Sequence, residues 1–221
     1  MRISPKVKSL LDATWEKKGE VVFIAYAMID KTEQSIKYIL NKALKDRNRE
    51  YVVPLYSCIK ELTTNSIKAN IKQVLMMESE KDKPLTKEEL LKRLKSILRE
   101  DILLEYGIKT KEYGLSTRIY MREETDELII RVINPVPLNY EQLERISKKM
   151  NASRRYDNLA HFYLENPDPE AEGMGLGLSM VTVLLKGSGI DPDVFKVYSD
   201  MRKKTIAELS IPLGKKHRLE A

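Results

Sequence analysis

Three glycines at alternate positions, Gly173, Gly175 and Gly177, run directly into an apolar stretch that has helical spacing. Glycine suits backbone that takes a positive φ or approaches another group closely. The first turn of a helix also offers unpaired N–H groups and a partial positive charge to an anion. This segment therefore has two interpretations: a tight turn that only begins a buried helix, or a cradle for a phosphate group.

The composition excludes several classes of protein. The chain has 221 residues, 42% of them apolar and 33% charged, which is typical of a soluble globular protein with a proper core. Its single cysteine, Cys58, excludes an internal disulfide framework and favours a reducing compartment, and one Cys with two distant His cannot build a zinc site. The longest apolar run, residues 21–29, is too short to span a bilayer and predicts a buried strand. With no secretory signal in the first residues, we expect a cytoplasmic protein that contacts no membrane.

The net charge of +6 raises the question of nucleic-acid binding. The lysines, however, alternate with Glu and Asp along predicted helices, as in residues 31–47, and do not gather with aromatic side chains. We therefore expect a solvated charged surface and no nucleic-acid partner.

Apolar periodicity predicts helices in the first half of the chain. After a helical leader and a strand at residues 20–29, Asp30 or Thr32 is expected to cap a helix with these apolar positions: Ile36, Ile39, Leu40 and Ala43. A further helix is expected from Pro54 to about Met77. A capping box from Thr86 to Glu89 predicts the start of another, which reaches about Leu104.

The second half predicts paired strands. Residues 115–134 and 194–213 alternate like two strand pairs, and the crossover helix that follows the glycines lies between them. Residues 135–172 predict a short helix followed by a polar, mobile loop. This order predicts a mixed sheet covered by helices, an α+β sandwich.

The helix predicted after Pro54 carries a line of polar residues. Glu61, Asn65 and Lys68 share one face, beside an apolar stripe expected to face the core: Leu55, Ile59, Leu62 and Ala69. The amide oxygen is a hard ligand for Mg²⁺, the ammonium neutralises phosphate charge, and the carboxylate can orient water or a nucleophile. The alternative is a solvated helix face.

These segments resemble the motifs of the GHKL ATPases, the superfamily of gyrase, Hsp90, histidine kinases and MutL. Residues 61–69 look like the asparagine box, and residues 172–181 look like the second glycine box in its histidine-kinase form. Residues 129–138 stand where the first glycine box belongs, and residues 205–212 are similar to the closing strand. All four segments follow the order of the family.

The resemblance implies the Bergerat fold, a mixed and mainly antiparallel sheet covered on one face by helices, with a mobile ATP lid. It implies ATP and Mg²⁺ as ligands, Asn65 as the residue that coordinates Mg²⁺, and Glu61 as a general base or water-orienting carboxylate. The nucleotide-binding positions that it implies are Asn65, Lys68, Asn134, Gly173, Met174, Gly175, Leu176, Gly177, Leu178 and Thr205. Candidates for contact with the γ-phosphate are Lys148, Lys149, Arg154 and Arg155.

In this interpretation the ATPase domain covers residues 20–214, after the helical leader at 1–19 and before a basic tail at 215–221. A helical insertion is expected at about residues 83–106 and the lid at about residues 147–172. The helix within the insertion either packs on the sheet or offers a docking surface to a partner.

The first glycine box departs from the family. Asn134 stands where relatives have an aspartate that accepts a hydrogen bond from the adenine amino group, and Val136 stands where they usually have glycine. Asparagine still accepts through its carbonyl oxygen. Loss of the charge-assisted bond weakens binding by about 1 kcal/mol without abolishing it.

The chain also lacks the phosphoacceptor of a sensor kinase. His161 and His217 both follow the asparagine box, and neither precedes an acidic residue. The helix between the first strand and Asn65 resembles that of the anti-sigma factor serine kinases. We therefore expect a module that acts on a separate protein partner, as a protein kinase or an ATP-gated switch. A degenerate scaffold that binds a partner without ATP turnover is the alternative, and the sequence leaves the oligomeric state open.

Overall fold

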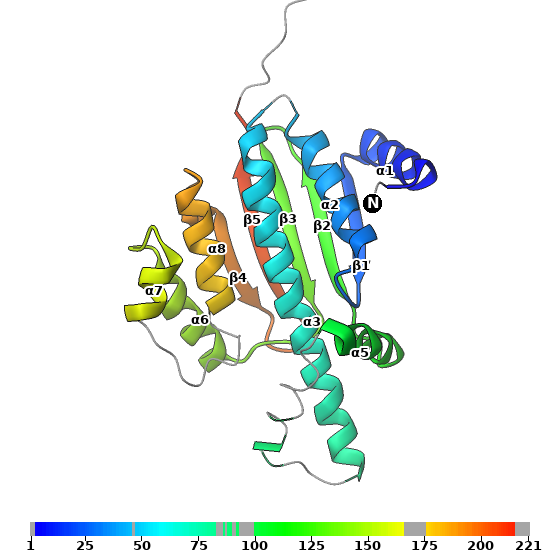
Figure 1. Cartoon of the computed structure of the whole chain (residues 1–221), viewed down its shortest axis with the longest axis vertical. Helices are drawn as coiled ribbons and strands as arrows, with labels where there is room; N and C mark the ends of the chain where they lie inside the picture. The colour runs from blue at the N-terminus through cyan, green and yellow to red at the C-terminus, as the bar shows by residue number, and fades with distance from the viewer. Residues whose placement is uncertain are drawn as a thin grey trace, which may run out of the picture.

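One sheet with helices on one face organises the molecule (Figure 1). The computed structural model describes residues 3–45, 47–82, 100–165 and 176–214, together with residues 86, 88, 89 and 92. The sheet has five strands in the order β1-β2-β3-β5-β4. Their bounds are β1 Glu20–Ala25, β2 Thr117–Glu123, β3 Glu127–Asn134, β4 Phe195–Ser199 and β5 Thr205–Pro212. The α+β class is confirmed, but all four pairings of these strands are antiparallel, so the expectation of a mixed sheet is wrong.

The helices are α1 Pro5–Lys18, α2 Asp30–Ala43, α3 Val52–Asp82, α5 Glu100–Glu112, α6 Tyr140–Ser153, α7 Leu159–Glu165 and α8 Leu176–Gly187. Among the described residues, none of them is long and apolar enough to cross a membrane. The long helix α3 lies over the middle of the sheet, with α2 on one side of it and α8 on the other (Figure 1).

The core forms where the helices meet the sheet. Alternate side chains of β2, such as Ile119 and Met121, are fully buried, as the period of a strand requires. The four apolar positions predicted for α2 are all buried, and so are three of the four predicted for α3: Leu55, Ile59 and Leu62. Each such side chain contributes about 1.5–3 kcal/mol through removal from water, so this contact fixes α3 on the sheet.

The first strand is shorter and more exposed than the sequence predicts. It ends at Ala25 and lies at the edge of the sheet, where Val22 and Ile24 are 54% and 58% exposed. The chain then turns into α2, whose N-cap is Ile29, with no side-chain hydrogen bond. The predicted cap at Asp30 or Thr32 is therefore wrong.

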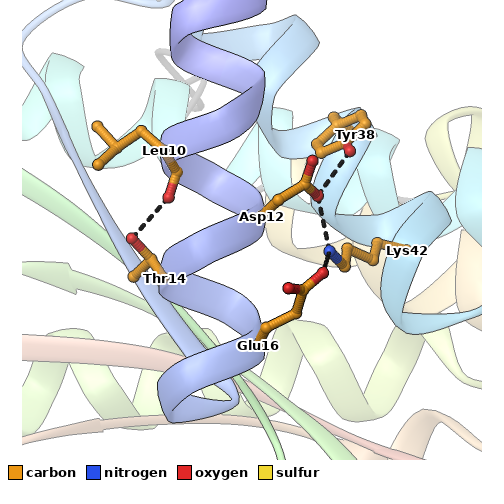
Figure 2. Close-up of polar contacts among 6 residues, drawn as sticks. All are labelled: Leu10, Asp12, Thr14, Glu16, Tyr38 and Lys42. Carbon is orange, nitrogen blue, oxygen red and sulfur yellow. Dashed lines mark hydrogen bonds and ion pairs between the residues drawn. The ribbon is translucent and has the colours of Figure 1, made fainter.

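The helical leader packs on the rest of the domain. Two of its side chains join the main core, Leu11 and Trp15. Figure 2 shows the polar contact beside them: Asp12 accepts hydrogen bonds from the Tyr38 hydroxyl at 2.7 Å and the Lys42 ammonium at 2.6 Å. Lys42 also pairs with Glu16 at 2.8 Å. The contact ties α1 to α2.

Part of the segment predicted as a mobile lid is helical. Residues 147–153 complete α6, and α7 follows. Tyr156 and Phe162 meet edge to face, with ring centroids 5.2 Å apart, in a small cluster with Val183 of α8. The polar sequence therefore forms packed structure up to Glu165, and residues 166–172 lie outside the described part of the chain.

The predicted capping box is confirmed. The Glu89 N–H donates to Thr86 Oγ1 at 3.2 Å, and the Thr86 N–H donates to Glu89 Oε2 at 2.8 Å. Most of the insertion that this box opens lies outside the described residues. Its last helix, α5, packs against α3, where Tyr106 contacts a cluster made of Ile67, Ile71 and Leu75.

Candidate functional site

Two adjacent faces of α3 line two separate hollows. Leu62, Asn65, Ser66 and Ala69 line a pocket against the sheet. Ser57, Lys60, Glu61, Thr64 and Ile67 line a groove on the other side. Both sets have helical spacing, and neighbouring residues of a helix point about 100° apart because a turn takes about 3.6 residues. We call the first hollow the strand-side pocket and the second the outer groove.

The strand-side pocket brings together predicted residues from four elements. Asn65 of α3, Asn134 of β3, Leu178 of α8 and Thr205 of β5 all line it. Its volume is about 120 Å³. An apolar cavity of about 150 Å³ holds a benzene ring, so the pocket suits part or all of one planar ring system. The remaining lining is largely apolar and includes Ala69, Val132, Ile146, Val197 and Ala207.

Hydrogen bonds fix the polar edge of this pocket. The Thr205 hydroxyl donates to the Val136 carbonyl at 2.9 Å, and the Val136 N–H donates to Asn134 Oδ1, also at 2.9 Å. The Asn134 amide nitrogen donates to the Ser66 carbonyl at 3.4 Å. An amide oxygen accepts two hydrogen bonds, so Asn134 Oδ1 can accept one more.

Gly177 of α8 lies against Glu61 and Asn65 of α3. Asn65 Nδ2 donates to Glu61 Oε1 at 3.0 Å, and Gly177 packs against this pair. A Cβ at Gly177 would lie 2.0 Å from Glu61 Oε1 and 2.5 Å from Asn65 Nδ2. The Glu61–Asn65 hydrogen bond therefore keeps this geometry because residue 177, more than a hundred residues away in the sequence, has no side chain.

The side-chain amide of Asn65 uses one of its two polar groups within the chain. Its amide nitrogen is used by Glu61, and no hydrogen bond from the described residues reaches its oxygen. The oxygen is thus free to bind a hard cation. Among the described residues, no group of three or more His, Cys, Asp or Glu side chains could hold a metal ion.

The structure describes only some of the other predicted site residues. Leu176 begins α8, whose first turn leaves N–H groups without helical partners, whereas Gly173, Met174 and Gly175 lie outside the described residues. Lys68 is half-buried and lines neither hollow.

The cations predicted near the γ-phosphate also line neither hollow. Lys148 pairs with Glu144 of its own helix at 2.7 Å, and Arg154 pairs with Asp193. The Arg155 guanidinium lies over the Tyr156 ring, 5.1 Å from its centroid.

The outer groove is a feature that the sequence analysis missed. Its volume is about 760 Å³, and it lies between the turn before α2, the outer face of α3 and Met180 of α8. Its charged lining consists of Asp30, Glu33, Lys60 and Glu61. The only available signal was Glu61 beside Lys60 on α3, since the other residues come from separate elements.

The wall of the groove holds one ionic cluster. Glu33 pairs with Lys60 at 2.8 Å and accepts a 2.5 Å hydrogen bond from the Tyr56 hydroxyl. Burial raises the pKa of Glu33, but the Lys60 and Tyr56 hydrogen bonds outweigh it and hold the pKa below its usual value. Glu33 is therefore an ionised carboxylate that Lys60 and Tyr56 hold in place. On the inner side of α3, burial raises the pKa of the Cys58 thiol to about 12, so this thiol is not a nucleophile.

The sequence of this chain is similar to part of a longer protein. The chain is 30% identical over 181 residues to an uncharacterized protein of Treponema pallidum (strain Nichols). The match covers 81% of this chain, which spans about a third (34%) of the length of that relative. No family model and no solved structure matches the chain.

Proposed function

We propose that the protein is a cytoplasmic ATP·Mg²⁺-binding module of the Bergerat type that acts on a separate protein partner, as a protein kinase or an ATP-gated switch. One observation carries the proposal: Asn65, Asn134, Leu178 and Thr205, which are far apart in the sequence, line a single pocket. The contact of Gly177 with Asn65 supports it independently.

Different residues would bind the base, the Mg²⁺ and the phosphates of the nucleotide. The planar base fits the largely apolar part of the strand-side pocket, where Asn134 Oδ1 accepts the hydrogen bond of an exocyclic amino group. The amide oxygen of Asn65 would hold Mg²⁺, and the cation would supply positive charge to the phosphate oxygens. The first turn of α8 supplies N–H groups and a partial positive charge to the same phosphates.

Phosphoryl transfer to the partner distinguishes a kinase from a switch, and Glu61 is the residue that would promote this transfer. Its carboxylate is hydrogen-bonded to Asn65 and faces the outer groove. A partner hydroxyl that enters from the groove forms a bond to the γ-phosphorus as the bond to ADP breaks, and Glu61 takes the hydroxyl proton. The products are ADP and a phosphorylated partner.

Calorimetry with ADP and Mg²⁺ tests the binding proposal. We expect the wild type to bind and Asn65→Ala to bind at least about tenfold more weakly, a loss of about 1.4 kcal/mol. Asn41→Ala is the matched control, because Asn41 is an amide on the surface of α2 that lines neither hollow. A folded wild type that binds no ADP at millimolar concentration would contradict the proposal.

A scaffold that binds its partner without ATP is the second candidate. The arrangement of Asn134 favours it, since both groups of its side-chain amide already have partners within the chain. Capture of the partner that is unaffected by nucleotide and by Asn65→Ala would support the scaffold over the ATPase.

A further inference from the structure

We infer that the outer groove binds a basic, partly apolar segment of the protein partner and brings its hydroxyl to Glu61. This inference rests on the proposed function and adds to it the chemistry of the substrate. The groove lies along α3 beside Glu61, between Met180 and residues 27–30, which lead into α2.

The charge of the groove is opposite to that of the chain. Three carboxylates and one ammonium line it, a balance of −2, whereas the whole chain carries +6. Lys60 is already paired with Glu33, so Asp30 and Glu61 remain without a cationic partner among the described residues. A triphosphate would be repelled here, and a cationic occupant is favoured.

The carboxylates of the groove belong to no metal-binding cluster of the described residues. No set of three or more acidic, His or Cys side chains among the described residues is close enough to hold a metal ion. Asp30 and Glu61 come from different helices, α2 and α3, and separate carboxylates of this kind match cations carried at intervals along a chain, as in a segment with several Lys or Arg residues.

The shape and the apolar lining favour a peptide. The volume of about 760 Å³ lies within the range of about 300–1,000 Å³ that is usual for ligand sites. The apolar part of the lining that is not already buried consists of Met28, Ile29 and Met180, with Ala27 beside them. Ile29 is 44% exposed, and methionine side chains adapt to different apolar partners. An occupant with apolar side chains between its cations would bury these surfaces.

One hydrogen bond joins a residue that lines the groove to a residue that lines the strand-side pocket. Glu61 lines the groove, Asn65 lines the pocket, and their side chains meet at 3.0 Å. A hydroxyl of the bound segment that reaches Glu61 is therefore next to the residue that holds Mg²⁺ in the proposed function. The groove positions the acceptor, and the pocket positions the nucleotide.

Fluorescence anisotropy with a labelled peptide tests the inference. The probe alternates arginine and leucine around a central serine, and its counterpart has glutamate in place of every arginine. We expect the wild type to prefer the arginine probe. Asp30→Lys should weaken that probe at least about tenfold. Glu141→Lys is the control, because Glu141 is likewise an exposed carboxylate in the first turn of a helix, far along the chain in α6.

A second variant separates binding from folding. Ile29 is the N-cap of α2 and makes no capping hydrogen bond, so Ile29→Ser removes an apolar contact of the groove while it adds a preferred cap. We expect the arginine probe to bind a few-fold more weakly and Tm to rise by about 2 °C. A loss of binding together with a gain in stability cannot result from misfolding.

The outcomes distinguish this inference from the proposed function. Equal affinity for the two probes, or equal effects of Asp30→Lys and Glu141→Lys, would overturn the groove while ADP binding still supports the ATPase. Charge-dependent probe binding without ADP binding would support the groove and overturn the ATPase. Asp30→Lys is expected to leave ADP affinity unchanged, because Asp30 does not line the strand-side pocket.

Discussion

The two hollows beside α3 differ in chemistry although they share one helix. The strand-side pocket is small, and its polar groups are uncharged amides and hydroxyls, whereas the outer groove is larger and lined by four charged side chains. The difference arises within α3, where consecutive residues such as Glu61 and Leu62 face different hollows. One helix therefore separates an uncharged pocket from a charged groove, and the Glu61–Asn65 hydrogen bond lies between them.

Filling the pocket gives the largest expected effect. Ala69→Leu adds volume on the face of α3 that lines the strand-side pocket, where a ring would lie. We expect ADP affinity to fall by more than about a hundredfold in calorimetry. Stability should change by less than about 1 kcal/mol, because leucine is a good helix former and enters existing space.

Thr64→Leu is the matched control on the other face. Thr64 lines the outer groove, so its replacement should weaken the arginine probe and leave ADP binding unchanged. If both variants reduced ADP binding equally, the two hollows would not be separate sites.

Gly177→Ala tests the Glu61–Asn65 hydrogen bond, which lies between the two hollows. The added Cβ displaces the ends of the Glu61 and Asn65 side chains, which are flexible, so the helix stays in place while their hydrogen bond breaks. We expect ADP to bind about tenfold more weakly and the free energy of unfolding to fall by about 1–3 kcal/mol.

Gly187→Ala separates this effect from the general cost of a change in α8. Gly187 is in the same helix, and apart from its chain neighbours and the nearby backbone of α8, no described atom lies within 4 Å of the Cβ that would be added there. Calorimetry should show wild-type ADP affinity for this control. An effect equal to that of Gly177→Ala would show that the fit at Glu61 is unimportant.

The strand-side pocket could be predicted from sequence, and the outer groove could not. The motifs place Asn65, Asn134 and Thr205 at separate positions along the chain, and the structure brings them to one pocket. The groove depends on how a turn, two helices and Met180 come together, which no local pattern contains. Its charges also resemble the solvated faces found on most surface helices.

The errors in the fold have a similar cause. The apolar run at residues 21–29 does not reveal that β1 is an edge strand, because Val22 and Ile24 are apolar although exposed. Likewise, the polar residues after α6 hide Tyr156 and Phe162, which pack on α8. Periodicity identified helices such as α2 correctly because their buried positions repeat within the element itself.

The smallest effect concerns the wall of the groove. Tyr56→Phe removes the hydroxyl that donates to Glu33, and Glu33 keeps its ion pair with Lys60. We expect the free energy of unfolding to fall by about 1 kcal/mol at neutral pH, as for one hydrogen bond to a partly buried charge. ADP affinity should not change, because Tyr56 does not line the strand-side pocket.

The pH dependence of this loss identifies its origin. The folded-state pKa of Glu33 lies below its ordinary value of 4.5, so its stabilising contribution is complete above pH 4.5 and disappears as pH falls through the folded-state value. The difference in stability between wild type and Tyr56→Phe should therefore shrink in acid, as urea denaturation at a series of pH values can measure. Tyr140→Phe, at a tyrosine that is 71% exposed, should show no difference at any pH. A Tyr56→Phe loss that stays constant below pH 4.5 would mean that the hydroxyl stabilises the fold by packing and that the ionic wall does not depend on it.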